Sequence, residues 1–133
     1  MNANEIRVGN GLNYKLSNGE TIYTVVTDTI IMRAVQFSSD FNNWFSPIPL
    51  SPEILEKCGF ELNRNNELSI EINDIASHLE LMSGTGGFYY PSFTQTPQGD
   101  EERTVYFNRI NSLHQIQNLY FSLCGEELTI TSK

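Results

Sequence analysis

Apolar and polar residues alternate in short runs along the first part of the chain, which is the pattern of β-strands. The runs cover residues 6–8, 12–16, 21–26 and 29–37, and a turn at residues 17–20 contains Gly19, which can adopt a positive φ without steric cost. Four or five short strands at this spacing predict a small N-terminal antiparallel sheet or an SH3-like barrel over residues 1–46.

The next segment changes character at two closely spaced prolines. Residues 38–45 are expected to form a loop that carries Trp44 and Phe45, and Pro47 and Pro49 predict an extended segment because both forbid helix. A short helix should follow, with Ser51 as its N-cap, Pro52 in its first turn and Gly59 ending it after Cys58.

The second half alternates again and then switches to helical spacing. Strands are expected at residues 60–62, 67–72, 88–90 and 104–107, with a polar loop at 91–103. Residues 75–82 fit a helix or a strand, and the surrounding meander favours a strand. Leu113, Ile116, Leu119, Tyr120 and Leu123 recur at spacings of three and four, which predicts a C-terminal helix from Ser112 to Cys124.

These elements together predict an α+β protein. Residues 1–46 would form a β subdomain, and residues 47–133 would form an α+β subdomain in which the C-terminal helix packs on the second meander. With 133 residues and 39% hydrophobic residues, we expect the two to form one compact unit.

Charge narrows the range of partners. The chain has 16 acidic against 8 basic residues, a formal charge of −8, which disfavours binding to nucleic acid or to an anionic membrane. No apolar run approaches the roughly 18 residues of a membrane span, and the first residues lack the pattern of a secretory signal. We therefore expect a cytoplasmic location and no membrane partner.

No cofactor, metal or catalytic group is predicted. Cys58, His78, His114 and Cys124 lie 20, 36 and 10 residues apart, without the close ligand pairs of a zinc site, and the cysteines are expected to be reduced. The glycine-rich run at 83–87 resembles a phosphate-binding loop but lacks its lysine, and strand residues follow it. A hairpin loop accounts for it better.

Aromatic residues are frequent near the expected loops, namely Trp44, Phe45, Phe88, Tyr89, Tyr90 and Phe93. Such side chains can stack on single-stranded nucleic acid, but a positive groove should accompany them and only Arg103 and Arg109 lie nearby in the sequence. Core packing accounts for them best, and a surface for a protein partner is the next interpretation.

Three segments, spread over the chain in order, carry a family resemblance. They are EIRVGN at residues 5–10, PIPLSPEILEKCGF at 47–60 and LHQIQNLYFSLCGEEL at 113–128. They resemble a family of small uncharacterised proteins of Bacteroides-type bacteria and their phages and prophages, whose segments run approximately LRIGN, PIPLTEEWLLKFGF and VHQLQNLYFALTGEEL. This chain has Ser-Pro in place of Thr-Glu in the middle segment and lacks its tryptophan. The resemblance implies a phage or prophage setting and transfers no activity.

The preferred function is a non-enzymatic interaction module, in the cytoplasm of a bacterial host, that binds another protein. Its candidate contact residues are Trp44, Phe45 and Ile48, together with His114, Gln115, Gln117 and Asn118, which are expected on the exposed side of the last helix. An alternative is an acidic inhibitor that mimics nucleic acid and blocks a host defence or nucleic-acid enzyme. A small enzyme would need a pocket that holds His78 or His114 beside a nucleophile or a carboxylate.

Overall fold

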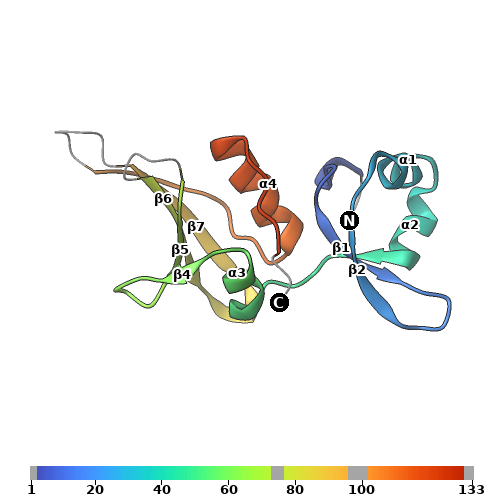
Figure 1. Ribbon diagram of the computed structural model, residues 1–133, viewed down its shortest axis with the longest axis horizontal. Coiled ribbons are helices and arrows are strands. Elements are labelled where there is room, and N and C mark those ends of the chain that lie inside the picture. Colours follow the sequence, from blue (N-terminus) through green and yellow to red (C-terminus); the bar gives the residue numbers. More distant parts are fainter. Residues whose placement is uncertain (1–2, 73–76, 96–101, 131–133) are drawn as a thin grey trace. The chain divides into compact units, whose positions relative to one another are not determined.

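The computed structural model describes residues 3–72, 77–95 and 102–130 of the chain. The chain divides into two compact units, each described here by itself (Figure 1). Unit 1 comprises residues 1–49 and 112–119, and unit 2 comprises residues 50–111 and 120–133. The boundary after residue 49 lies close to the boundary expected after residue 46, but the first part of the last helix belongs to unit 1.

Unit 1 combines a three-stranded antiparallel sheet with the helices α1 and α2 and with the first part of the last helix (Figure 1). A 3₁₀ turn, η1 (Ala3–Glu5), leads into the hairpin of β1 (Gly11–Lys15) and β2 (Thr21–Val25), followed by α1 (Asp28–Gln36), α2 (Ser38–Trp44) and β3 (Phe45–Ser46). The strand order is β2-β1-β3, and the turn between β1 and β2 contains Gly19 at φ 89°, as expected. The three strands form an open sheet, so the prediction of a barrel is wrong.

Three local predictions in unit 1 are also wrong. Residues 29–37 are helical instead of extended because Thr27 caps α1, its Oγ1 accepting a hydrogen bond from the Ile30 backbone N–H at 3.4 Å, and because Ala34 is buried one turn after Ile30. Residues 38–44 form α2 instead of a loop, with Phe41 turned into the core, and Phe45 begins β3. Residues 6–8 do not form a strand.

The core of unit 1 collects apolar residues from β1, α1, α2 and β3 and from the segments that follow η1 and β2. Its buried members are Ile6, Leu12, Val26, Ala34, Phe41 and Phe45. Gly11 allows a close approach at the start of β1, since a Cβ there would lie 2.5 Å from the Tyr23 ring and 2.8 Å from the Leu113 side chain.

Unit 2 contains a five-stranded antiparallel meander. Its elements are α3 (Pro52–Lys57), β4 (Glu61–Leu62), β5 (Leu68–Glu71), β6 (Ser77–Ser83), the 3₁₀ turn η2 (Thr85–Gly87), β7 (Tyr89–Gln95) and β8 (Arg103–Tyr106), with the strands in sequence order. The strand prediction for residues 75–82 is confirmed for residues 77–82; residues 75 and 76 lie outside the described ranges. The glycine-rich run lies between two paired strands, as expected of a hairpin loop.

The capped helix α3 agrees with its prediction in detail. The Ser51 Oγ accepts a hydrogen bond from the Ile54 backbone N–H at 3.3 Å, and Pro52 occupies the first turn. At the other end Gly59 has φ 106°, and the Phe60 N–H donates to the Leu55 carbonyl at 3.0 Å, which closes the helix as in a Schellman motif.

Strand β7 (Tyr89–Gln95) runs five residues further than the strand expected at residues 88–90. Residues 91–95, expected in a loop, pair with β6 over their whole length. Pro91 fits because its carbonyl accepts a hydrogen bond from the Phe107 N–H at 3.0 Å. In an antiparallel strand the carbonyl and the nitrogen of one residue face the same side, so the Pro91 nitrogen also faces away from β6. The proline therefore removes no hydrogen bond to β6, and its missing N–H lies next to the end of β8.

The last helix, α4 (Leu113–Cys124), confirms the predicted C-terminal helix, and Gly125 ends it with φ 75°. The Ser112 backbone N–H and hydroxyl both donate to the Gln115 Oε1, at 3.2 and 2.9 Å. Gln115 therefore reaches back over the first turn as the third residue of a capping box does.

Candidate interaction site

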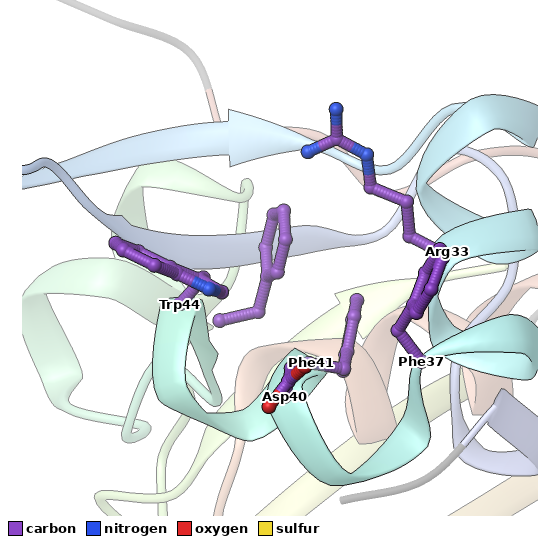
Figure 2. A pocket seen from close by; sticks show the side chains of 6 residues that line it. Arg33, Phe37, Asp40, Phe41 and Trp44 are labelled. Atoms are coloured by element: carbon purple, nitrogen blue, oxygen red, sulfur yellow. The ribbon is translucent and has the colours of Figure 1, made fainter.

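Unit 1 has a hollow of about 300 Å³ beside its two helices (Figure 2). The residues that line it come from α1, from α2 and from the segments that flank α2: Arg33, Phe37, Asp40, Phe41, Trp44 and Phe45. Four of these six side chains are aromatic. The hollow is therefore a candidate site for an apolar group.

Phe41 of α2 and Phe45, the first residue of β3, form the floor of the hollow. Phe41 and Phe45 are both 4% exposed, and their rings stack with centroids 4.6 Å apart and planes 15° apart. Tyr14 of β1 packs against Phe45 at 5.0 Å between ring centroids. The floor is thus fixed by the core of unit 1 and is held in one arrangement.

Two exposed aromatic side chains stand over this floor. Phe37, at the junction of the two helices, is 57% exposed, and Trp44, at the end of α2, is 47% exposed. Figure 2 shows Trp44 and Phe37 on opposite sides of the hollow. Large rings left in water on both sides of a hollow offer apolar area that a partner could cover.

The hollow also carries one charge of each sign. Arg33 and Asp40 are both exposed, and in the described part of the chain neither side chain has a hydrogen-bond or ion-pair partner. Figure 2 shows the Arg33 guanidinium extended away from Asp40. Both charges are therefore available to polar groups of a bound molecule.

Two further hollows adjoin the first through shared residues. One of about 570 Å³ shares Trp44 and is lined by Asn43 and by residues 15–19 of the hairpin turn. Another of about 250 Å³ shares Arg33 and Phe45 and is lined by Tyr14, Ile30 and three threonines, Thr24, Thr27 and Thr29. The candidate surface thus extends from the aromatic hollow in two directions within unit 1.

The predicted contact residues of unit 1 differ in their exposure to solvent. Trp44 lies at the aromatic hollow, as a contact residue should. Phe45 is 4% exposed and reaches the hollow only as part of its floor, and Ile48, 7% exposed, belongs to the interior. Phe37, Phe41, Arg33 and Asp40 were missed, although the spacing of Phe37, Phe41 and Phe45 is the signal that a helical interpretation of this segment would have used.

The polar residues of α4 do not form an exposed side. His114 and Gln117 are 3% and 1% exposed, so that expectation is wrong for both. Gln117 instead satisfies a buried backbone group, because its Oε1 accepts a hydrogen bond from the Gly11 N–H at 2.7 Å. The Asn118 Oδ1 accepts from Asn10 Nδ2 at 2.8 Å and from Arg7 Nε at 3.2 Å. Asn10, Gln117 and Asn118 form what we call the amide cluster of unit 1.

His114 is buried without hydrogen bonds. In the described residues neither ring nitrogen has a partner. Burial lowers the pKa of His114 from its ordinary value, and the nearby Glu5 carboxylate opposes this shift. Because its pKa lies below the ordinary value, His114 is a neutral interior residue at pH 7.

Unit 2 contains a polar cluster on the solvent side of its sheet. His78 Nε2 lies 2.6 Å from Glu80 Oε1, and Asn63 Nδ2 donates to Glu80 Oε2 at 3.4 Å. Desolvation, the charge of Glu80 and a hydrogen bond to it raise the pKa of Glu67. No group of three potential metal ligands occurs in the described residues, this cluster included.

The two thiols are free. Burial raises the pKa of the Cys58 thiol to about 11, so it is protonated at neutral pH and is a poor nucleophile. Cys124 donates a hydrogen bond to the Tyr120 carbonyl at 3.2 Å.

Comparison with known proteins adds no identification: no family model, curated protein or solved structure matches this chain. Within the described ranges, no helix has the length and apolar character needed to cross a membrane.

Proposed function

We propose that the protein is a non-enzymatic interaction module that binds another protein through the aromatic hollow of unit 1. The observation that carries this proposal is the pairing of a buried, stacked floor, Phe41 and Phe45, with the exposed rings of Phe37 and Trp44. A partner side chain that enters the hollow would gain apolar burial against a floor that is already ordered.

The composition of the hollow supports a protein partner. Tryptophan and arginine are the residue types that contribute most often to binding energy at protein interfaces, and the hollow has one of each, Trp44 and Arg33. Arg33 and Asp40, whose side chains have no partner among the described residues, could form polar contacts at its rim.

The resemblance of the three sequence segments supports the biological setting that we propose. Membership in a family found in bacteria and their phages and prophages would place this module on a mobile element. Its site of action would be the cytoplasm of the bacterial host.

Site-specific photo-cross-linking tests the proposed binding surface. A benzophenone amino acid at position 37 should cross-link a partner in host lysate, because Phe37 lies beside the hollow. The same amino acid at position 35, where Val35 is 66% exposed on α1 and does not line the hollow, is the matched control. Trp44→Ala in the position-37 variant should abolish the product.

The captured partner is then purified and titrated into the unmodified protein. Trp44 is the single tryptophan of the chain, so its emission reports directly on the hollow and should shift on binding. Equal cross-linking from positions 35 and 37, or an unchanged Trp44 spectrum at saturation, would contradict the proposal.

A specific observation keeps the acidic inhibitor as a second candidate. The strand register places Glu61, Ser69 and Glu80 side by side across β4, β5 and β6, and Glu71 shares their face of the sheet. A basic groove of an enzyme could bind such a face. In that case Glu61→Gln combined with Glu71→Gln should weaken partner binding, whereas Trp44→Ala should leave it unchanged.

A further inference from the structure

Strand β2 forms the outer edge of the sheet in unit 1 and is poorly covered (Figure 1). Four of its five residues are exposed and the fifth, Thr24, is half-buried. Three of them have large apolar or aromatic side chains: Ile22, Tyr23 and Val25 are 45%, 43% and 48% exposed. An outer strand with these properties can pair with a further strand.

The hydrogen bonds at the two ends of the hairpin show which backbone groups face outward. The Val26 N–H donates to the Asn10 carbonyl, and the Leu16 N–H donates to the Glu20 carbonyl, both at 2.7 Å. Because bonded and non-bonded pairs alternate along an antiparallel ladder, Ile22 and Thr24 also face β1. The backbone groups of Thr21, Tyr23 and Val25 therefore point away from β1.

This edge lacks the features that normally prevent strand pairing. Residues 21–27 contain no charged residue and no proline. The edge strand β8 of unit 2 differs, since it begins with Arg103 and follows the acidic residues 100–102 in the sequence. Charged residues at an edge oppose its pairing with another chain.

We propose that β2 pairs with β2 of a second copy of this chain, antiparallel and centred on Tyr23. In that register Tyr23 faces its own counterpart, Thr21 faces Val25, and Ile22 faces Thr24. Both copies would use the same outward-facing backbone groups, which is the requirement for a two-fold interface. The two sheets would join into one of six strands.

Charge favours a second copy in this position and in this direction. The register places Glu20 opposite Val26 and Asp28 opposite Asn18, so no two acidic side chains face each other directly. Parallel pairing in register would place Glu20 beside Glu20. The uncharged edge also belongs to unit 1, which has a formal charge of −1 against −7 for unit 2. Two copies of the acidic chain can therefore approach each other there with less repulsion.

Sedimentation of the full chain over a range of concentrations tests the interface. We expect a dimer that dissociates on dilution, and Val25→Lys should raise its dissociation constant at least about tenfold because it places a charge at the edge of each copy. Val35→Lys, an equally drastic change at an exposed site of α1, should leave the constant unchanged. A monomer at all concentrations, or equal effects of the two lysines, would overturn the proposal.

Cysteine cross-linking tests the register. Directly opposed residues of a bonded pair have Cα atoms about 5.5 Å apart, within the range that a disulfide spans. Tyr23→Cys should therefore give a covalent dimer on mild oxidation, whereas Thr21→Cys should not, since its counterpart would lie four residues further along the strand. The parent chain, with its own two cysteines, gives the background. Equal cross-linking at positions 21 and 23 would refute the register.

Discussion

The two units place their polar groups in opposite ways. Unit 1 has four acidic and three basic residues, a formal charge of −1, whereas unit 2 has twelve acidic and five basic residues, a charge of −7. The interior of unit 1 is the more polar of the two. Asn10, His114 and Gln117 are buried in unit 1, whereas the buried polar side chains described in unit 2 are the smaller Ser77 and Thr94.

The proposed function assigns binding to unit 1, and the difference between the two units agrees with that proposal. The sheet of unit 2 buries Leu68, Leu79 and Leu81 on one face and carries Glu61, Glu71 and Glu80 on the other. Unit 1 leaves aromatic surface in water and depends on amide hydrogen bonds within. Unit 1 thus combines exposed apolar side chains with buried amide groups that are hydrogen-bonded. This combination is typical of a protein surface that is specialised for contact.

The largest effect is expected in the apolar interior of unit 2. Phe60→Ala removes a ring that is 1% exposed and should lower the free energy of unfolding by about 3–5 kcal/mol. Urea unfolding followed by far-UV circular dichroism measures this loss. Leu62→Ala, at a site that is 62% exposed two residues further on, is the control and should change it by less than about 0.5 kcal/mol.

The amide cluster of unit 1 should be the next most sensitive feature. Gln117→Leu leaves the buried Gly11 N–H without its acceptor and should cost about 1–3 kcal/mol. Trp44 emission during urea unfolding follows unit 1 specifically. Gln36→Leu, on the exposed surface of α1, controls for the change of residue type. A Gln117→Leu variant as stable as the parent would show that the cluster contributes nothing.

His114 should make stability dependent on pH. Burial lowers its pKa in the folded state below the ordinary value of 6.5, so folding favours the neutral ring. The stability present above pH 6.5 should therefore decrease as the pH falls below that value. His114→Leu removes both unpartnered nitrogens, should stabilise by about 1 kcal/mol at pH 7, and should reduce the acid-induced loss. Parallel pH curves for variant and parent would contradict this assignment.

The smallest effect is expected on the acidic face of unit 2. The pKa of Glu67 is raised, so its ionisation at neutral pH is disfavoured in the folded state. Glu67→Gln should raise the melting temperature slightly at pH 7, and the gain should vanish as the pH falls below the ordinary Glu value of 4.5. Glu53→Gln, in the first turn of α3, should lack this gain because the charge there favours the helix.

Local signals in the sequence predicted the fold where a few adjacent residues decide it. Ser51, Pro52 and Gly59 define both ends of α3, and alternation defines β5, whereas β6 was predicted from the meander around it. The strand predicted at residues 29–37 was wrong. Ile30 and Ile31 favour a strand, but the Thr27 cap and the burial of Ala34 stabilise a helix.

The candidate site was only partly predictable for a related reason. Trp44 was singled out as a contact residue, but the floor of the hollow depends on helical geometry that the strand and loop predictions excluded. The role of Gln117 depends on Gly11, which is 106 residues away in the sequence. No local pattern reveals such a partner.

The 106 residues that separate Gly11 from Gln117 determine when unit 1 can be completed during synthesis. A nascent chain that has just left the ribosome with residues 1–49 lacks Gln117 and Asn118, so the groups of Asn10 and Gly11 that they satisfy must remain hydrated. All five strands of the unit 2 sheet emerge before these acceptors do. The N-terminal part of the protein is therefore made first but can be completed only after the whole unit 2 sheet has emerged, in contrast to the usual sequence in which domains fold as they appear.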